Sequence, residues 1–165
     1  ADVGTGSGCV GVAIAVARPA ARVVAIDRSA AALAVARRNV RTHGASGRMH
    51  LVRADLLTGT RGPFDVIVSN PPYVPSGDAS RLPPEVSGHE PAEALFAGTD
   101  GLEVVRALVP QAAAQLKPGG WLVFEIGITQ ADGARAIVDA DGSLLIEGVL
   151  PDLQGIPRTV VARRR

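Results

Sequence analysis

The sequence predicts a doubly wound α/β domain, in which a mostly parallel sheet is covered by helices on both faces. Apolar runs of strand length alternate with segments whose apolar residues repeat at helical spacing, and polar residues follow each of the first four runs. The expected strands lie at residues 1–3, 22–26, 49–53, 64–69, 121–125, 144–149 and 158–162. Since parallel strands end at one edge of a sheet, the polar residues should gather there.

The first half of the chain contains two expected helices. Residues 8–17 predict a short buried helix, with Cys9 as a small interior residue. Ser29, just after the strand at 22–26, is a suitable N-cap for the second helix, which ends at residues 43–44. The apolar face of that helix is formed by Leu33, Ala36 and Val40.

A long irregular segment follows the fourth strand. Residues 70–98 are rich in proline and glycine, which predicts a loop with at most short helical turns. A loop of this length inside a compact domain is usually functional.

The second half of the chain returns to regular structure. Residues 101–116 have apolar positions at helical spacing, and Pro118-Gly119-Gly120 should stop this helix before the strand at 121–125. A further helix at 130–139 precedes the two closing strands.

Size, charge and cysteine content narrow the class of protein, and they weaken a DNA-binding interpretation without excluding it. The 165 residues are expected to form one domain, and 17 Lys and Arg balance 16 Asp and Glu, so no strongly basic nucleic-acid surface is predicted. One cysteine cannot form an internal disulfide, and no segment has the character of a signal peptide or membrane span, so we expect a cytoplasmic protein. The chain starts without Met directly before a glycine loop, so we expect a truncated first strand and a missing N-terminal segment.

The glycine loop at residues 4–8 reads GTGSG, and its glycines allow a sharp turn and close approach to a ligand. The third glycine of a dinucleotide fingerprint would fall at Cys9, and no P-loop Lys follows, so neither of those sites is predicted. Asp27 could accept hydrogen bonds from both hydroxyls of a ribose, and Asp55 could meet an adenine amine. Alternatively, the loop is only a tight turn and the aspartates are turn or cap residues.

The stretch SNPPYVP interrupts the chain directly after the fourth strand. Proline fixes its own φ and keeps the preceding residue out of helical geometry, so Asn70 is held rigidly. The Asn70 side chain and the Pro71 carbonyl both offer acceptors, which suits one planar NH₂ group, and Tyr73 could lie against its face. The alternative is a rigid proline turn.

These motifs resemble a known family. The order DxGTGSG, Asp27, Asp55 and NPPY resembles class I S-adenosylmethionine-dependent methyltransferases that methylate planar amino nitrogens. The stretches LPPEVSGHEPAEALFAGTDGLEVVRAL, LKPGGWLVFEIGITQ and DLQGIPRTVVAR are similar to the HemK-type protein glutamine methyltransferases, which modify peptide chain release factors. NPPY alone is shared with adenine DNA methyltransferases.

The resemblance implies a Rossmann-like, seven-stranded sheet with an antiparallel last strand, and a catalytic domain over residues 1–165 that methylates the Gly-Gly-Gln glutamine of release factors. The implied cofactor-binding residues are Asp2, Gly4, Thr5, Gly6, Ser7, Gly8, Asp27, Asp55, Leu56 and Asn70. The residues implied to bind glutamine are Asn70, Pro71, Pro72 and Tyr73, of which Asn70, Pro71 and Tyr73 are implied to be catalytic.

Two features depart from the family. Its members carry an N-terminal helical domain that helps to grip the release factor, and it is absent from this sequence. Position 56 is often aromatic in relatives and is Leu56 here. Two other functions therefore stay open: an adenine or cytosine amino methyltransferase acting on DNA or RNA, which would have to flip its base, and a catalytically silent paralogue that only binds the cofactor.

A metal site is not expected. His43, His50 and His89 lack the spacing of metal ligands. Glu125 ends the fifth strand and is either close to the site or a structural carboxylate. Residues 163–165 are expected to form a solvated basic tail, with a weak RNA or ribosome contact as the alternative.

Overall fold

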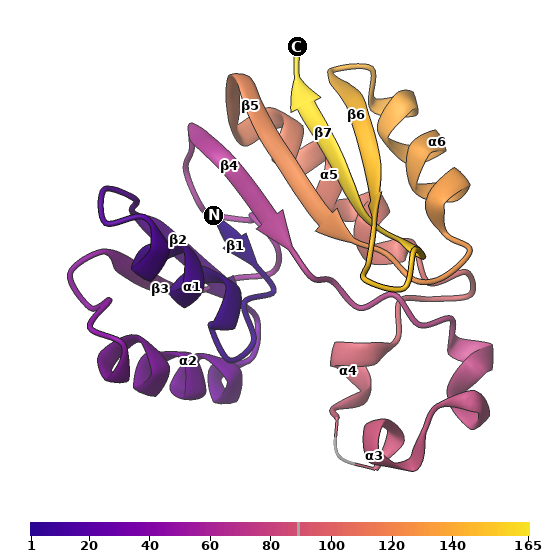
Figure 1. Ribbon diagram of the computed structural model, residues 1–165, viewed down its shortest axis with the longest axis horizontal. Coiled ribbons are helices and arrows are strands. Elements are labelled where there is room, and N and C mark those ends of the chain that lie inside the picture. The colour runs from indigo at the N-terminus through magenta and orange to yellow at the C-terminus, as the bar shows by residue number, and fades with distance from the viewer. Residues whose placement is uncertain (89) are drawn as a thin grey trace.

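The computed structural model describes residues 1–88 and 90–165, and His89 lies outside the described residues. The chain folds into a seven-stranded sheet of order β3-β2-β1-β4-β5-β7-β6, shown in Figure 1. The strands are β1 (Asp2–Val3), β2 (Val23–Asp27), β3 (Met49–Arg53), β4 (Phe64–Ser69), β5 (Leu116–Glu125), β6 (Leu144–Pro151) and β7 (Pro157–Arg164). β7 is antiparallel to both neighbours, while β1 to β5 pair in parallel, so the predicted fold class is confirmed.

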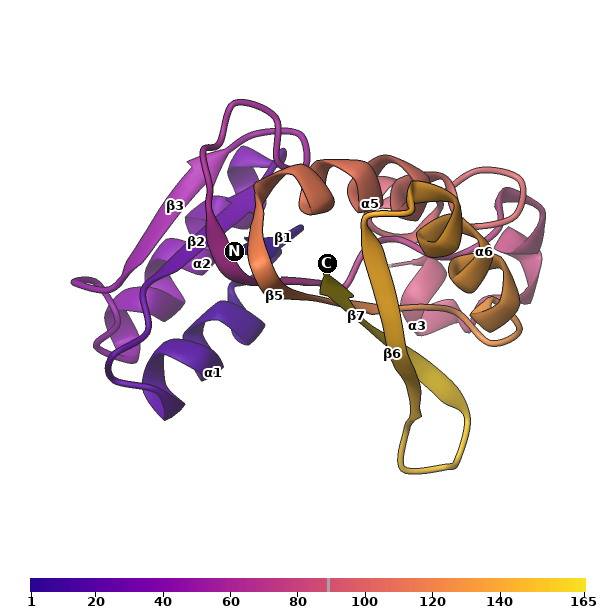
Figure 2. The ribbon, with the colours of Figure 1, turned by 90° about the horizontal axis from the view of Figure 1, so that it is seen from above.

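Four longer helices cover the two faces of the sheet: α1 (Cys9–Ala17), α2 (Ala30–Thr42), α5 (Glu103–Gln115) and α6 (Ala131–Asp141). Figure 2 shows α1 on one face, beside the β2 end of the sheet, and α5 and α6 on the other face. A smaller apolar cluster lies under α1 and α2, whereas the main core lies between α5, α6 and the sheet. No helix in residues 1–88 and 90–165 is long and apolar enough to cross a membrane.

Local sequence explains the predicted α2 closely. The Ser29 side chain caps the helix by accepting a hydrogen bond from the Ala32 amide (3.2 Å), as expected for an N-cap serine. Leu33, Ala36 and Val40 are its buried residues. The apolar periodicity therefore identified both the start of this helix and the face that meets the sheet.

The helix α1 is less enclosed than its composition predicts. Val10 and Val16 are 39% and 53% exposed, and Cys9 is exposed as well. The prediction of a buried helix with Cys9 in the interior is therefore wrong. The residues that α1 does bury are Gly11, Val12 and Ala15, which face β2 and β3.

The start of β5 also differs from expectation. Helix α5 ends at Gln115, and the buried Leu116 is already extended and pairs with Phe64 of β4. The next paired residue is Trp121, so residues 117–120 bulge out of the strand, where Gly119 adopts a φ of 75°. The Pro-Gly-Gly stretch therefore forms a bulge within the strand and does not separate the helix from the strand.

Apart from His89, which is not described, the segment after β4 contains only short helical turns, as predicted. These are η1 (Ser76–Arg81), α3 (Pro84–Ser87) and α4 (Ala92–Leu95). In Figure 1 they form a separate lobe beneath the sheet, away from α1 and α6. The base of the lobe is closed by hydrogen bonds from the Val74 amide to the Leu95 carbonyl (2.8 Å) and from the Ala97 amide to the Val74 carbonyl (3.0 Å).

Neighbouring residues of β4 should differ sharply in their effect on stability. Ile67 is fully buried, so Ile67→Ala should lower the free energy of unfolding by about 2–5 kcal/mol through lost burial and a new cavity. Val66 is 42% exposed, and Val66→Ala should cost about 0.5 kcal/mol. Urea denaturation of both variants measures the difference, and equal losses would contradict the assignment of the core face.

Candidate functional site

The register of three strands brings the predicted polar residues together. Val3 of β1 pairs with Ile26 of β2 on one side and with Ser69 of β4 on the other. The residues that follow these three in the chain are Gly4, Asp27 and Asn70. These residues therefore lie side by side at the same edge of the sheet. The Ser69 hydroxyl donates to the Val3 carbonyl (2.8 Å), which fixes this alignment.

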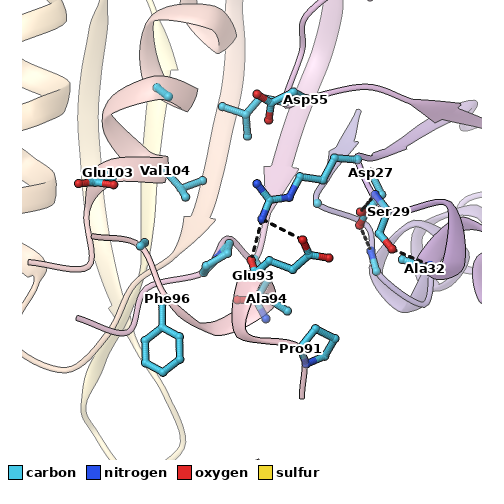
Figure 3. Close-up of a pocket in the computed structure, with 18 of the residues that line it drawn as sticks. Asp27, Ser29, Ala32, Asp55, Pro91, Glu93, Ala94, Phe96, Glu103 and Val104 are labelled. Carbon is cyan, nitrogen blue, oxygen red and sulfur yellow. Dashed lines mark hydrogen bonds and ion pairs between the residues drawn. The ribbon is translucent and has the colours of Figure 1, made fainter. Parts of the chain in front are cut away.

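A cavity of about 450 Å³ opens at this edge of the sheet, as Figure 3 shows. Its walls come from the glycine loop, the ends of β2 and β3, the start of the segment after β4, α4 and the first turns of α5. The residues that line it are Gly4, Gly6, Asp27, Arg28, Ser29, Ala32, Ala54, Asp55, Leu56, Asn70, Pro72, Pro91, Glu93, Ala94, Phe96, Ala97, Glu103, Val104 and Ala107.

Asp27 anchors the glycine loop to the end of β2. One carboxylate oxygen accepts a hydrogen bond from the Gly6 amide (2.8 Å), and the other accepts one from the Ser29 amide (2.8 Å). Each carboxylate oxygen can accept a further bond, and Asp27 lines the cavity. The side chain therefore fixes the loop and can still receive donors from a ligand.

The glycine loop offers a bare backbone surface to the cavity. Gly4 and Gly6 have φ values of 68° and 55°, and a Cβ on either would have no atom within 4 Å. Because other residues rarely adopt such angles, glycine is needed to form this turn. Gly8 is buried and lies close to Ala36, whereas Ser7 is exposed and its carbonyl accepts a bond from Asn39 Nδ2 (2.8 Å).

Asp2 and Thr5 are buried beneath the glycine loop, where they fix its conformation, and they do not line the cavity. Asp2 is only 2% exposed and accepts hydrogen bonds from the Thr5 hydroxyl (2.5 Å) and the Gly11 amide (2.9 Å). Burial raises the pKa of the Asp2 carboxyl, which these two hydrogen bonds partly offset. The predicted roles of Asp2 and Thr5 can therefore only be indirect, through the shape of the loop.

Asp55 and Leu56 line the opposite wall, one strand further along the sheet. Leu56 adopts a φ of 49°, which is rare for a branched residue, and the next residue, Leu57, is fully buried. Gln111 of α5 accepts a bond from the Leu57 amide (3.0 Å). Packing behind the turn thus keeps Leu56 facing the cavity.

The Asn-Pro-Pro-Tyr stretch is divided between the cavity and its surroundings. Asn70 and Pro72 line the cavity, whereas Pro71 is buried and Tyr73 is partly buried beside it. Neither the Asn70 side chain nor the Pro71 carbonyl has a hydrogen-bond partner among residues 1–88 and 90–165. Two acceptors therefore remain available after this strand.

Tyr73 is held in a mixed polar environment. The Arg158 guanidinium lies 5.9 Å from the centre of its ring, in a cation–π arrangement. Burial raises the pKa of the Tyr73 phenol, and the negative charge of Glu125 raises it further, while Arg158 acts in the opposite direction. Glu125 therefore lies close to the predicted site, although it does not line the cavity.

Two pairs of residues were not predicted from the sequence. Arg28 donates to the Glu93 carbonyl (3.3 Å) and forms an ion pair with the Glu93 carboxylate (3.6 Å), which joins α4 to the end of β2 across the cavity, as the dashed lines in Figure 3 show. Gln130 is 7% exposed and donates to the carbonyls of Tyr73 and Asp100. Glu93 and Gln130 both lie in stretches that carry the family resemblance. Their contacts were not predicted, because the partners are 65, 57 and 30 residues away in sequence.

The chain is similar to known methyltransferases. Residues 1–82 match the family described as the methyltransferase small domain. The release factor glutamine methyltransferase of Bradyrhizobium diazoefficiens is 44% identical over 164 residues, which cover 99% of this chain and 55% of that protein. The enzyme of the same name from Moorella thermoacetica is 44% identical over 166 residues, covering 100% of this chain and 58% of that protein. The chain thus spans somewhat more than half the length of these relatives.

A solved structure with a similar fold is the T. thermophilus 16S rRNA N2 methyltransferase in complex with AdoMet and guanosine. It superimposes with a TM-score of 0.67 at 20% identity, covering 99% of this chain and 36% of that chain. At this identity the likeness concerns the fold alone.

The pH dependence of stability should reveal the ion pair between Asp100 and Arg106 at the start of α5. Arg106, and then the Leu102 amide, lower the pKa of the Asp100 carboxyl from 3.8 to about 2. A lowered folded-state pKa gives stability that is present above about pH 4 and is lost as the pH falls toward 2. The melting temperature of the parent should therefore exceed that of Asp100→Asn at neutral pH, and the difference should shrink in acid. A difference that does not change with pH would contradict this.

Proposed function

Since the chain belongs to the methyltransferase family whose curated relatives are release factor glutamine methyltransferases, we propose that it methylates the side-chain amide nitrogen of a glutamine in a peptide chain release factor. The methyl donor in this proposal is S-adenosylmethionine, and residues 1–165 act as the catalytic domain. The observation that carries the proposal is that the Asn70 carboxamide, which has no hydrogen-bond partner in the described part of the chain, lines the same cavity as Asp27 and the glycine loop.

The cavity suits this cofactor. The bare backbone of Gly4 and Gly6 leaves room for close approach of the methionine part, and the Asp27 carboxylate has acceptor capacity left for two ribose hydroxyls. Asp55 and Leu56, which line the cavity, would hold the adenine, with Leu56 supplying apolar contact in place of an aromatic ring. S-adenosylmethionine supplies, when bound, a methyl group made electrophilic by its sulfonium.

Asn70 and Pro71 would prepare the glutamine nitrogen for attack. An amide nitrogen is a weak nucleophile because its lone pair is delocalised into the carbonyl. The Asn70 side-chain oxygen and the Pro71 carbonyl would each accept a hydrogen bond from one N–H group of the glutamine amide. These two hydrogen bonds increase the electron density on the nitrogen and fix its orientation. Holding two reactants in this way can lower a barrier by roughly 7–11 kcal/mol.

The roles of Pro72 and Tyr73 are to shape the binding site for the glutamine side chain. Pro72 lines the cavity and limits the backbone freedom of Pro71. Tyr73, held by Arg158, gives a partly buried ring beside the amide acceptors. No strong base is required before attack, because the nitrogen becomes acidic once it carries the methyl group.

The release factor is favoured over nucleic acid as the substrate by the charge of the chain as well as by its relatives. With a net charge of +1, the protein has little excess positive charge to attract a phosphate backbone. A release factor substrate also places the protein in the cytoplasm, where translation terminates.

Incubation with labelled S-adenosylmethionine tests the proposal directly. The protein is offered a release factor, the same factor with its Gly-Gly-Gln glutamine replaced, or unmethylated DNA. Label should enter only the first of these. Labelled DNA would favour an amino methyltransferase of nucleic acid, and tight cofactor binding without any labelled product would favour a silent paralogue.

We predict that Asn70→Ala loses turnover and keeps the cofactor. Removal of one oriented group from a catalytic clamp typically costs about 2.7–4 kcal/mol in the transition state, which corresponds to a 100- to 1,000-fold lower kcat. Calorimetry should find the affinity for S-adenosylmethionine close to that of the parent. Unchanged turnover would remove Asn70 from the catalytic role.

We predict that Asp27→Ala mainly weakens the binding of the cofactor. Loss of charge-assisted hydrogen bonds to the ribose, together with release of the Gly6 amide, should weaken cofactor binding by about 10- to 100-fold. Asp139→Ala, the same substitution on the exposed surface of α6, is the matched control and should bind like the parent. If calorimetry gives equal affinities for all three proteins, Asp27 does not hold the ribose.

A further inference from the structure

A buried carboxamide outside the cavity joins three separate parts of the chain. Gln130, directly before α6, accepts a hydrogen bond at Oε1 from the Gly127 amide (2.7 Å). Its Nε2 donates to the Tyr73 carbonyl (2.8 Å) and to the Asp100 carbonyl (3.0 Å). Both hydrogens of the NH₂ group are therefore used within the protein, and Gln130 has none left for a ligand.

The two carbonyls that share this nitrogen lie at the two ends of the long segment after β4. Tyr73 is three residues beyond Asn70, and Asp100 lies just before α5. The base of the segment is closed a second time by the backbone bonds of Val74 with Leu95 and Ala97. Gln130 thus connects this closed base to the residues that follow β5.

Two glycines make room for the Gln130 side chain. A Cβ on Gly101 would collide with Gln130 Nε2 and with the Tyr73 carbonyl, and its φ of 73° also favours glycine. A Cβ on Gly127 would lie 3.0 Å from Gln130 Oε1. The backbone around Gln130 therefore approaches the carboxamide more closely than other residue types would allow.

We infer that Gln130 is a positioning residue for methyl transfer: by holding the Tyr73 carbonyl, it fixes where the Asn70-Pro71-Pro72 stretch stands beside the cavity. The two prolines are stiff, so a displacement at Tyr73 passes to the acceptors of Asn70 and Pro71. Misplacement of catalytic groups by about 1 Å can cost about 100-fold in rate. The catalytic part of this inference rests on the proposed function, whereas the effect on Tyr73 does not.

Gln130→Glu is the sharpest variant, since it changes the chemistry and preserves the shape. It keeps an acceptor for the Gly127 amide and places a second oxygen where the NH₂ group met two carbonyls. At neutral pH we expect kcat to fall about 10- to 100-fold, with the cofactor dissociation constant unchanged. As the pH falls, the introduced carboxyl becomes protonated and can donate one bond again, so the ratio of variant to parent kcat should rise. A ratio that stays constant with pH overturns the positioning role.

Tyr73 supplies a readout that requires no methyl transfer. It is the only tyrosine in the chain, so the absorbance of tyrosinate reports its titration alone. Gln130→Leu removes all three hydrogen bonds, and the raised pKa of Tyr73 should then move back toward 10.0 as the ring gains freedom and solvent. A titration curve identical to that of the parent overturns the inference.

Val138→Ala is the control for a general loss of stability. Val138 is fully buried in α6, the helix that follows Gln130, and its apolar side chain cannot donate a hydrogen bond to the Tyr73 carbonyl. This variant should melt at a lower temperature and keep the kcat and the Tyr73 titration of the parent. If it reproduces the kinetic effects of Gln130→Glu, the role of Gln130 is only structural. If the parent does not methylate a release factor at all, the proposed function fails, while the Tyr73 titration still decides whether Gln130 holds this backbone.

Discussion

The parallel pairing of β1 with β2 and β4 is the constraint on which the site depends. It aligns Val3, Ile26 and Ser69 across the centre of the sheet, so the next residue of each strand reaches the same edge. A shift of one residue in either pairing would reverse the faces of a strand and separate Asp27 or Asn70 from the glycine loop. The register of the sheet therefore sets the relative positions of the residues to which the proposed chemistry is assigned.

Two polar side chains then convert this alignment into a fixed site. Asp27 ties the glycine loop to the end of β2 by accepting two amides, and Gln130 ties the segment after β4 to the end of β5 through two carbonyls and one amide. One side chain faces the cavity and the other is buried behind it. The cofactor side and the glutamine side of the proposed site are thus stabilised independently.

Much of this arrangement could be predicted from the sequence, because it depends on local patterns. Apolar periodicity located β3 and β4 and the buried face of α2, and the order of polar residues after the strands predicted that Asp27 and Asn70 would meet. The inward direction of Asp2 was not foreseen, since it depends on the Gly11 amide at the start of the next helix. Gln130 was missed for a similar reason: its partners are backbone carbonyls that lie 57 and 30 residues away, and no side-chain pattern marks them.

The contact between Arg28 and Glu93 has a consequence for how α4 is held at the cavity. It joins two walls of the cavity, yet both side chains are more than half exposed, and such surface ion pairs typically contribute about 0–1 kcal/mol. Thermal motion can therefore break it often, while the hydrogen-bonded base of the lobe stays closed. Opening of this pair would release the side-chain link between α4 and the end of β2 without breaking the backbone bonds of Val74 with Leu95 and Ala97.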